Sequence, residues 1–486
     1  MELSDKKIAT KGNRTKRAKK TIVDTSVLNP DQRMAFGKLA AYVQNPNCDD
    51  IYVLKGWAGT GKTFCVSLLV KYVLEELYSS KKWYKIAVTG PTNKSVRVIK
   101  KTSGIRHPQV SFVTIHKLLG LKEKITLDGR QEFVNDTGVS SGINQTKLLI
   151  IDEVSMLNDD LFEEIVNHRH RVKIICMGDP AQIPPVGRPD CIPFRDELAQ
   201  EYGIETIQLK TIMRQKMGNP IIDASIKIRE NLSSSVSLIT PANNINESGE
   251  GMEFLNLHDS ETRKGFSGIV SRYYNSPRFR EDPDYVKIIA WRNKTVATMN
   301  SVVRKTIYGE ESMNSKILVG ERLIANNPII FSGIIQFNTN DEFTVESYQI
   351  LSEKVAGEFG TFDIKYYEAK VSYLDDNDDL CYDTIDILHE DSEPDFSKIA
   401  GHLKSTAIRK AGKDRSWIAY YDFLRKYADV SYAYAITAHK SQGSTYEVAF
   451  ISEDDIDLNY QTVEKNRIKY TAYTRASKKL YVLKKF

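Results

Sequence analysis

A glycine-rich segment at residues 56–63, which reads GWAGTGKT, constrains the fold more than any other feature of this sequence. It follows the apolar run 51–54 and precedes a helical pattern over 63–77, so we expect it to connect a strand to a helix. Gly59 and Gly61 allow backbone N–H groups to close around a phosphate, and the start of the helix attracts the anion. The segment therefore predicts a nucleoside-triphosphate site.

Two kinds of side chain complete this predicted site. Within the loop Thr60 stands between the two glycines, Lys62 would neutralise the β and γ phosphate oxygens, and Thr63 would ligate Mg²⁺. Asp152 and Glu153 follow the apolar run 148–151, where parallel sheets bind ligands. Asp152 can hold the metal, and Glu153 can orient and deprotonate the attacking water. An acidic pair after a strand is common on protein surfaces, but beside a phosphate loop it favours an ATP hydrolase.

Short β-rich runs alternate with helical patterns along the chain, which predicts two α/β domains in tandem. The runs of the first half are 51–54, 85–88, 148–151 and 172–176, and those of the second half are 286–290, 432–436, 448–451 and 480–483. A chain of 486 residues has room for three or four domains of about 100–200 residues.

Two stretches interrupt this alternation. Residues 121–147 carry Asp128 and Gly129 between two alternating runs, which indicates a β-hairpin. Residues 343–429 begin with strand-like segments, pass through the acidic run 375–379 and end in a helical pattern, so we expect an inserted β-rich module. The predicted domains are 21–210 with the hairpin insertion, 211–342 joined with 430–486, and the module 343–429.

Composition sets limits on the class of protein. Hydrophobic residues make up 41% and charged residues 27%, as in globular proteins, and no apolar run approaches the roughly 18 residues that span a bilayer. The N-terminus is charged where a signal peptide would be apolar. Five cysteines are scattered without CxxC spacing, which argues against a zinc site and a disulfide framework. We expect a cytoplasmic protein without membrane association, in the host-cell cytoplasm if it is phage-encoded.

The net charge of +5 is too small to identify a polyanionic partner by itself. Residues 1–20 are different, because eight lysines and arginines crowd a segment with almost no apolar content. A solvated, disordered tail is the simplest interpretation. Additional contact with nucleic acid and a localisation signal are the alternatives.

Eight further short segments stand out along the chain. They are 28–32 (LNPDQ), 89–94 (TGPTNK), 114–117 (TIHK), 178–185 (GDPAQIPP), 211–214 (TIMR), 290–294 (AWRNK), 437–445 (TAHKSQGST) and 470–476 (YTAYTRA). With the phosphate loop, they resemble superfamily 1 helicases of the RecD-like 5′-to-3′ branch over about 28–482. The resemblance implies two RecA-like motor domains, and it implies an SH3-like fold for the inserted module.

The resemblance also implies roles for residues around the nucleotide. Gln32 would read adenine, Gln182 would sense the γ-phosphate, and Gly443 would lie at the ATP site. Arg214 and Arg475 would reach the γ-phosphate from the second motor domain as arginine fingers. Met213 stands where many relatives have a tyrosine that stacks on adenine. Taken singly, each of these side chains would be an ordinary surface residue.

Residues that would contact DNA follow from the same resemblance. They are Thr92, Asn93, Thr114, His116, Asn293, Thr437, His439 and Lys440. The hairpin would act as the wedge that splits the duplex, with Phe133 as a candidate aromatic at its tip. A core aromatic of the hairpin is the alternative interpretation of Phe133.

These observations predict a monomeric ATP-dependent 5′-to-3′ DNA helicase that uses ATP and Mg²⁺ on single-stranded and forked DNA. Replication or recombination proteins, such as a single-strand-binding protein, are expected partners. Two alternatives remain: a translocase that displaces proteins with weak unwinding, and a nucleic-acid-binding protein that uses ATP only as a conformational switch. A nucleotide kinase fits least, because it does not explain the segment 437–445.

Overall fold

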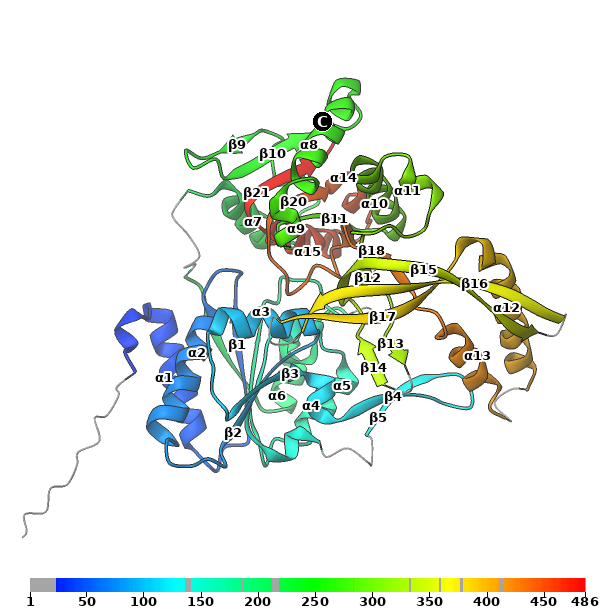
Figure 1. Ribbon diagram of the computed structural model, residues 1–486. Coiled ribbons are helices and arrows are strands. Elements are labelled where there is room, and N and C mark those ends of the chain that lie inside the picture. Colours follow the sequence, from blue (N-terminus) through cyan, green and yellow to red (C-terminus); the bar gives the residue numbers. More distant parts are fainter. Residues whose placement is uncertain are drawn as a thin grey trace, which may run out of the picture.

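The computed structural model describes residues 23–135, 141–185, 187–211, 218–282, 284–331, 334–357, 360–375, 379–410 and 414–485. The predicted basic tail at 1–20 lies outside the described residues. Two α/β domains lie one above the other, and a β-rich module lies beside both of them (Figure 1). None of the helices in these described ranges combines the length and the apolar content that crossing a membrane requires.

The first α/β domain is built on a six-stranded parallel sheet. Its order is β3-β2-β6-β7-β1-β8, with strands β1 (Ile51–Gly56), β2 (Lys85–Gly90), β3 (Val110–Thr114), β6 (Thr146–Ile151), β7 (Lys173–Gly178) and β8 (Ile204–Leu209). Four of these strands were predicted from apolar runs. The edge strands β3 and β8 were not, because they are half exposed and carry no continuous apolar run.

Helices cover both faces of this sheet, so its strands are apolar on both sides. Helices α1 (Pro30–Gln44), α2 (Lys62–Tyr72) and α3 (Asn93–Ser103) pack on one face, and α4 (Ile115–Leu119) and α5 (Asp159–Val166) pack on the other. The short α6 (Asp196–Glu201) precedes β8. The predicted helix over 63–77 is α2 followed by a π-helical turn at Val73–Leu77.

The second α/β domain has a similar layered construction. Its sheet has the order β19-β11-β20-β21-β10-β9, with β9 (Asn244–Ile245), β10 (Gly251–Leu255), β11 (Val286–Ala290), β19 (Ala435–Thr437), β20 (Tyr446–Ser452) and β21 (Ala476–Leu483). Its helices are α7 (Pro220–Glu230), α8 (Ser260–Tyr274), α9 (Pro277–Glu281), α10 (Asn293–Tyr308), α11 (Glu311–Asn314), α14 (Glu453–Ile456) and α15 (Thr462–Tyr473). The fold therefore contains two RecA-like motor domains, as predicted.

The β-rich module is an antiparallel sheet with long central strands. Its order is β17-β16-β15-β12-β18, with β12 (Arg322–Ala325), β15 (Glu342–Gly357), β16 (Gly360–Leu374), β17 (Leu380–Leu388) and β18 (Val430–Tyr432). A small hairpin, β13 (Ile329–Phe331) and β14 (Ile334–Phe337), and helices α12 (Glu393–Lys410) and α13 (Ser416–Leu424) accompany it. The predicted boundaries at 343 and 429 fall inside this sheet, because β12 and β18 pair within it. The SH3-like character of the module stays a prediction.

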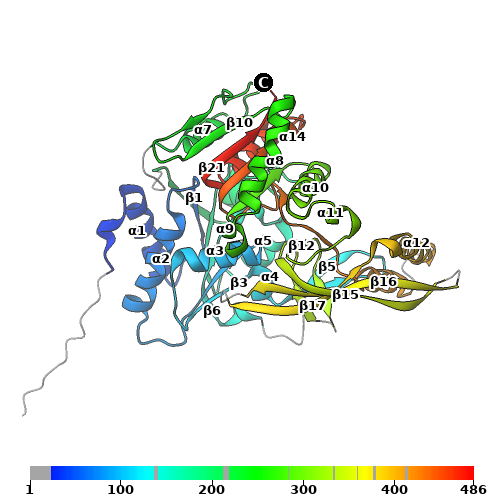
Figure 2. The same cartoon turned by 45° about the horizontal axis from the view of Figure 1, so that its top comes forward.

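The predicted hairpin in the first motor domain consists of β4 (Leu121–Ile125) and β5 (Gln131–Asn135). Gly129 adopts φ +85° in its turn, a conformation that favours glycine. The hairpin reaches below the module toward α13 (Figure 1), and Figure 2 shows it behind the long strands β15 and β16. There the Tyr421 hydroxyl donates to the Gly129 carbonyl at 3.3 Å, and a Cβ on Gly129 would lie 2.5 Å from the Trp417 ring. The tip of the hairpin is thus supported by α13.

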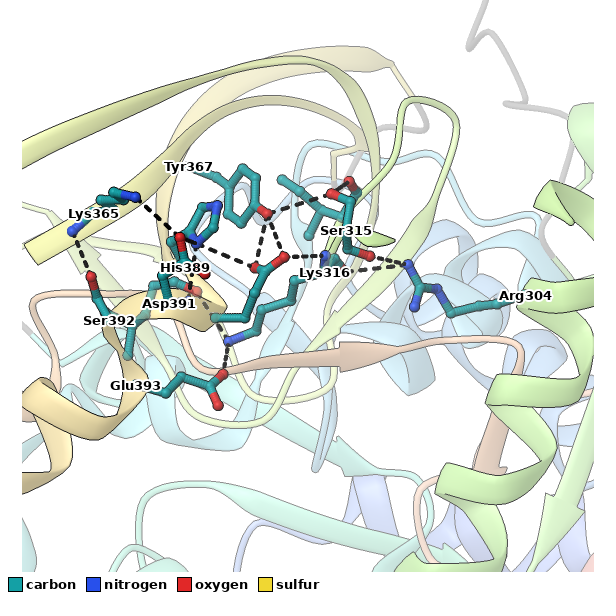
Figure 3. Close-up of polar contacts among 12 residues, drawn as sticks. Arg304, Ser315, Lys316, Lys365, Tyr367, His389, Asp391, Ser392 and Glu393 are labelled. Atoms are coloured by element: carbon teal, nitrogen blue, oxygen red, sulfur yellow. Dashed lines mark hydrogen bonds and ion pairs between the residues drawn. The ribbon is translucent and has the colours of Figure 1, made fainter. Parts of the chain in front are cut away.

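Polar contacts fasten the module to the second motor domain (Figure 3). Arg304 on α10 forms a buried ion pair with Glu321 and donates to the carbonyls of Ser312 and Ser315 at 3.0 Å. The Tyr367 hydroxyl donates to Glu390 at 2.8 Å, and its ring stacks on His389. The base of the module is therefore tied to α10 by buried and charged groups.

Candidate functional site

The phosphate loop between β1 and α2 has the conformation that its glycines require. Gly59 and Gly61 have φ angles of +84° and +78°, and Gly61 is the N-cap of α2. A Cβ on Gly61 would lie 2.5 Å from Nε2 of Gln32, so a larger residue would not fit. The Lys62 ammonium donates to the carbonyls of Gly56 and Trp57 at 2.7 and 3.2 Å. Thr63 follows it in the first turn of α2, and Thr60 is fully buried.

Gln32 supports this loop from α1. Its Nε2 donates to the Thr60 carbonyl at 2.9 Å, and its Oε1 accepts the Asn29 N–H at 3.2 Å as part of a capping box. The side chain is 1% exposed, so both ends of the amide are engaged with backbone. Recognition of adenine by Gln32 stays a prediction.

The acidic pair lies beside the phosphate loop. Asp152 follows β6, and its N–H donates to the Thr89 carbonyl of the neighbouring strand at 2.8 Å. Burial, and next the charge of Glu153, raise the pKa of Asp152 to about 7, whereas Lys62 opposes this shift. Glu153 has a φ of +51°, a conformation that costs on the order of 1–3 kcal/mol for a non-glycine residue. Strain of this kind is typical of functional sites.

Asp179, which follows β7, connects the two motor domains. Its carboxylate is fully buried, and it accepts hydrogen bonds from the Tyr470 hydroxyl at 2.6 Å and from Arg229 Nη2 at 3.0 Å. The Tyr470 hydroxyl also accepts the Ala58 N–H of the phosphate loop at 3.3 Å. Helices α7 and α15 of the second motor domain therefore contact the loop through side chains that our sequence analysis did not single out.

A cavity of about 300 Å³ lies where these groups meet. The loop residues Trp57 and Ala58 line one side, and Arg229 and Tyr470 line the other. Neither Trp57 Nε1 nor Arg229 Nε, both buried donors, has a hydrogen-bond partner among the described residues. Donors of this kind, next to a phosphate loop, fit a ligand rich in acceptors. The cavity therefore adjoins the phosphate loop at Trp57 and Ala58, whereas Lys62, Asp152 and Glu153 are not among its lining residues.

The segment 178–185 is held by the second motor domain at two points. The Ile183 N–H donates to Thr471 Oγ1 at 3.3 Å, and Gln442 Nε2 donates to the Ile183 carbonyl at 3.0 Å. The residue before Ile183 is Gln182, which is 5% exposed and whose Oε1 has no hydrogen-bond partner among the described residues. Gln182 therefore lies next to a residue that is hydrogen-bonded to the second motor domain. Its role in sensing stays a prediction.

Of the two predicted arginine fingers, Arg475 lies among the described residues and Arg214 does not. Arg475 is buried within the second motor domain, where it donates to the carbonyls of Thr471 and Ser444 at 3.0 and 2.9 Å and to Thr474 Oγ1 at 3.0 Å. Its guanidinium must leave these partners to reach a phosphate. Arg214, like Met213, lies outside the described residues.

The predicted DNA-contacting residues of the first motor domain lie at one edge of its sheet. Thr92 follows β2 and Thr114 ends the neighbouring parallel strand β3, and each caps the helix that comes next. Burial lowers the pKa of His116. Asn93 donates to the carboxylate of Asp341 in the module at 3.2 Å. The side chain of Phe133 lies outside the described residues, although its backbone pairs with that of Glu123 in the hairpin.

The predicted residues of the second motor domain lie at the corresponding edge. Asn293 is exposed at the start of α10, and Thr437 ends β19 beside β11. Burial lowers the pKa of His439 and of Lys440, whose ammonium donates to Asn326 at 3.0 Å. Gly443, with a φ of +72°, lies against Ser95 of α3. The loop 437–445 therefore contacts the first motor domain and the module.

Two family models match separate parts of the chain. Residues 27–249 match the AAA domain, and residues 432–483 match the UvrD-like helicase C-terminal domain. The first match contains the phosphate loop and the acidic pair. The second contains the loop 437–445, α15 and Arg475.

Known proteins of similar length are related over most of this chain. The Uncharacterized protein R530 of Acanthamoeba polyphaga mimivirus is 25% identical, over 93% of this chain and 99% of that protein. The ATP-dependent DNA helicase dda of Enterobacteria phage T4 is 25% identical, over 87% of this chain and 92% of that protein. A Bacteroides Pif1 helicase, solved with ADP-AlF3 and ssDNA, covers 92% of this chain with 18% identity and a TM-score of 0.45.

Proposed function

We propose, from the premise that this chain is a superfamily 1 helicase of the RecD-like branch, that it hydrolyses ATP to move 5′-to-3′ along single-stranded DNA and to unwind duplex DNA. The observation that carries this proposal is the contact of Tyr470 with Asp179 and with the phosphate loop. It joins the nucleotide site of one motor domain to a helix of the other. A change at the nucleotide can therefore move the domains relative to each other.

Hydrolysis would use the acidic pair and the phosphate loop. Lys62 would bind the β and γ phosphate oxygens, and Glu153 would take the proton of the attacking water. Thr63 and Asp152 would hold Mg²⁺, which neutralises charge on the phosphate oxygens when it is bound. Arg475 and Arg214 would complete the site from the second domain. The buried oxygen of Asp152, whose pKa is raised by burial, fits a group that becomes ionised beside a cation.

Movement would come from opening and closing of the cleft. Only a ligand that binds the closed state more tightly can shift the equilibrium toward closure, and a γ-phosphate bound from both sides meets this condition. Thr92 and Thr114 lie on one domain and Thr437 on the other. A single DNA strand held by these residues of both domains would be shifted each time the cleft closes and opens.

Strand separation would take place at the β4–β5 hairpin. A wedge must resist the force of the duplex, and contacts to α13 through Trp417 and Tyr421 support its turn. This support favours an unwinding enzyme over a translocase with weak unwinding. We include a monomeric state and partners among replication or recombination proteins in the same proposal.

Forked duplexes test this function. Purified protein with ATP and Mg²⁺ is mixed with forks that carry a single-stranded arm at the 5′ side or at the 3′ side only. The proposal expects strand separation with the 5′ arm and little with the 3′ arm. Release of a bound protein block without strand separation would support the translocase instead, and separation only with the 3′ arm would overturn the polarity.

A further inference from the structure

Glu342 is a buried carboxylate where three parts of the molecule meet. It begins β15 of the module, and its side chain is 10% exposed. Lys287 on β11 of the second motor domain contacts it at 3.0 Å, and Lys94 on α3 of the first motor domain contacts it at 3.4 Å. Arg322 on β12 lies 4.0 Å away. Cations from both motor domains and the module therefore share one carboxylate.

Lys94 reaches across the domain boundary into this site. Its ammonium pairs with Asp284 at 2.8 Å, and it lies 5.0 Å from the centre of the Tyr446 ring. Both partners belong to the second motor domain, next to β11 and β20. Burial alone would lower the pKa of Lys94, but Asp284 and Glu342 hold it well above its ordinary value. Lys94 is thus a charged group whose environment depends on the apposition of the two domains.

Two more residues of α3 extend the same contact. Asn93 donates to Asp341 at 3.2 Å, and Arg97 donates to the Leu374 carbonyl at 3.0 Å. Asn340, next to Asp341, has a φ of +70°, which makes it the second described non-glycine residue with positive φ besides Glu153. The strained turn 338–341 presents the carboxylate of Asp341 to the start of α3. The helix that begins at the predicted DNA-contacting Thr92 is therefore docked on the module.

The module is fixed to the second motor domain by other contacts. Arg304 and Glu321 form a buried pair at its base, and Lys287 also donates to the Ala433 carbonyl at 2.6 Å. These groups would stay together if the two motor domains separated. The contacts that α3 makes with the module would break in that case, because α3 belongs to the first motor domain. Opening of the cleft would therefore break the Lys94–Glu342 contact and leave the Lys287–Glu342 contact in place.

We propose that Lys94 and Glu342 form a reversible latch that transmits closure of the motor domains to the β-module. The inference rests on the proposed function, which supplies the opening and closing. Release of Lys94 leaves Glu342 paired with Lys287, so its charge remains compensated. Asp284, whose side chain is 40% exposed, is then solvated by water. The latch can therefore open without leaving an isolated buried charge, unlike an ordinary buried ion pair.

A double-mutant cycle tests the latch. Lys94→Met, Glu342→Gln and the double variant are compared for base pairs unwound per ATP hydrolysed. Each single variant should lower this ratio about 3-fold or more, and the double variant should lower it by clearly less than the product of the two effects, because the two changes share the Lys94–Glu342 pair. Lys101→Met, an exposed lysine on the same helix, is the matched control and should behave as wild type. Effects that multiply in the double variant would overturn the latch.

Two further measurements protect the result against other causes. Glu342→Gln leaves the buried Lys287 without its carboxylate partner, and this variant can fail to fold for that reason. In that case Asp284→Asn takes its place in the cycle, and the same loss of unwinding per ATP is expected. The alternative is that Lys94 binds a DNA phosphate. In that case Lys94→Met alone would weaken binding of single-stranded DNA, and the latch would be rejected.

Hydrogen exchange reports on the latch without an activity assay. The rate of amide exchange at residues 341–345 should rise in Lys94→Met. That rise in a protein without ATPase activity would support the latch and reject the proposed function.

Discussion

The hydroxyl of Tyr470, on α15 of the second motor domain, donates a 2.6 Å hydrogen bond to the buried carboxylate of Asp179 in the first motor domain. The same hydroxyl accepts the Ala58 N–H of the phosphate loop. One side chain thus connects the loop, the segment after β7 and the opposite domain. Arg229 completes the cluster by pairing with Asp179 and by stacking on Trp57 at 4.6 Å.

Tyr470→Phe tests this connection with little change in volume. Asp179 keeps its bond to Arg229, so we expect the free energy of unfolding to fall by only about 1–3 kcal/mol. Because the loop loses its contact with α15, ATP turnover should fall much more than nucleotide affinity does. Steady-state kinetics with urea unfolding would measure both effects. Tyr460→Phe, at a side chain that is 88% exposed, is the control. A turnover equal to that of wild type would contradict the coupling role.

Arg475→Ala tests the finger role of a residue that the structure shows turned inward. Turnover should fall by about 10³-fold or more because the γ-phosphate loses a cation, while ATP binding changes little. Arg475→Lys should also be defective, since an ammonium cannot reproduce the planar donor geometry of a guanidinium. Single-turnover hydrolysis and nucleotide titration measure the two quantities, and a melting curve reports any loss of the bonds to Thr471 and Ser444. Near-normal single-turnover rates in Arg475→Ala would reject the role.

Trp417→Ala removes the aromatic ring against which the hairpin turn packs. Hydrolysis stimulated by single-stranded DNA should stay close to wild type, because α13 supports the hairpin turn, whereas the acidic pair follows β6 of the first motor domain. Unwinding of a fork should fall about 3-fold or more, since the wedge loses its support. The two assays are run on the same preparation, with Tyr460→Ala as the exposed aromatic control. Equal loss in both assays would show a general defect instead.

Asp152 gives the site a pH dependence. Its pKa of about 7 lies above the ordinary value, so the folded protein without metal carries a proton there below pH 7 and loses it as the pH rises. Between the ordinary pKa of 3.8 and about 7, the folded protein keeps a proton on Asp152 that the unfolded chain has lost. The free energy of unfolding therefore falls as the pH rises through this interval. Mg²⁺ needs the carboxylate, so binding of Mg²⁺ with ATP should tighten as the pH rises through about 7. Calorimetry at about pH 6, in buffers of different ionisation enthalpy, should show proton release. No dependence on the buffer would contradict this assignment.

The sequence predicted the phosphate loop, the acidic pair and the central strands, because each depends on residues that are close together in the chain. Lys62 and Thr63 follow from the loop spacing, and β6 follows from an apolar run. The Asp179–Tyr470 bond joins residues 291 positions apart, and the Lys94–Glu342 pair joins residues 248 positions apart. No local pattern reports such partners.

The start of the module was also misplaced for a physical reason. Strand β12 has four residues, and it belongs to the module sheet only because β15 and β18 pair with it. A short apolar run of this kind does not show which sheet it will join. The docking of the hairpin on α13 likewise depends on Trp417, nearly 300 residues further along the chain than Gly129.

ATP hydrolysis by wild-type protein and by Glu153→Gln, with and without an oligonucleotide that lacks a complement, tests the central claim most directly. The claim is that cleavage of ATP between two motor domains drives movement on single-stranded DNA. We predict that the oligonucleotide stimulates hydrolysis by the wild type, and that Glu153→Gln binds ATP but hydrolyses it at least about 10²-fold more slowly. Hydrolysis that is absent, or that is unaffected by both the oligonucleotide and the substitution, would contradict the account.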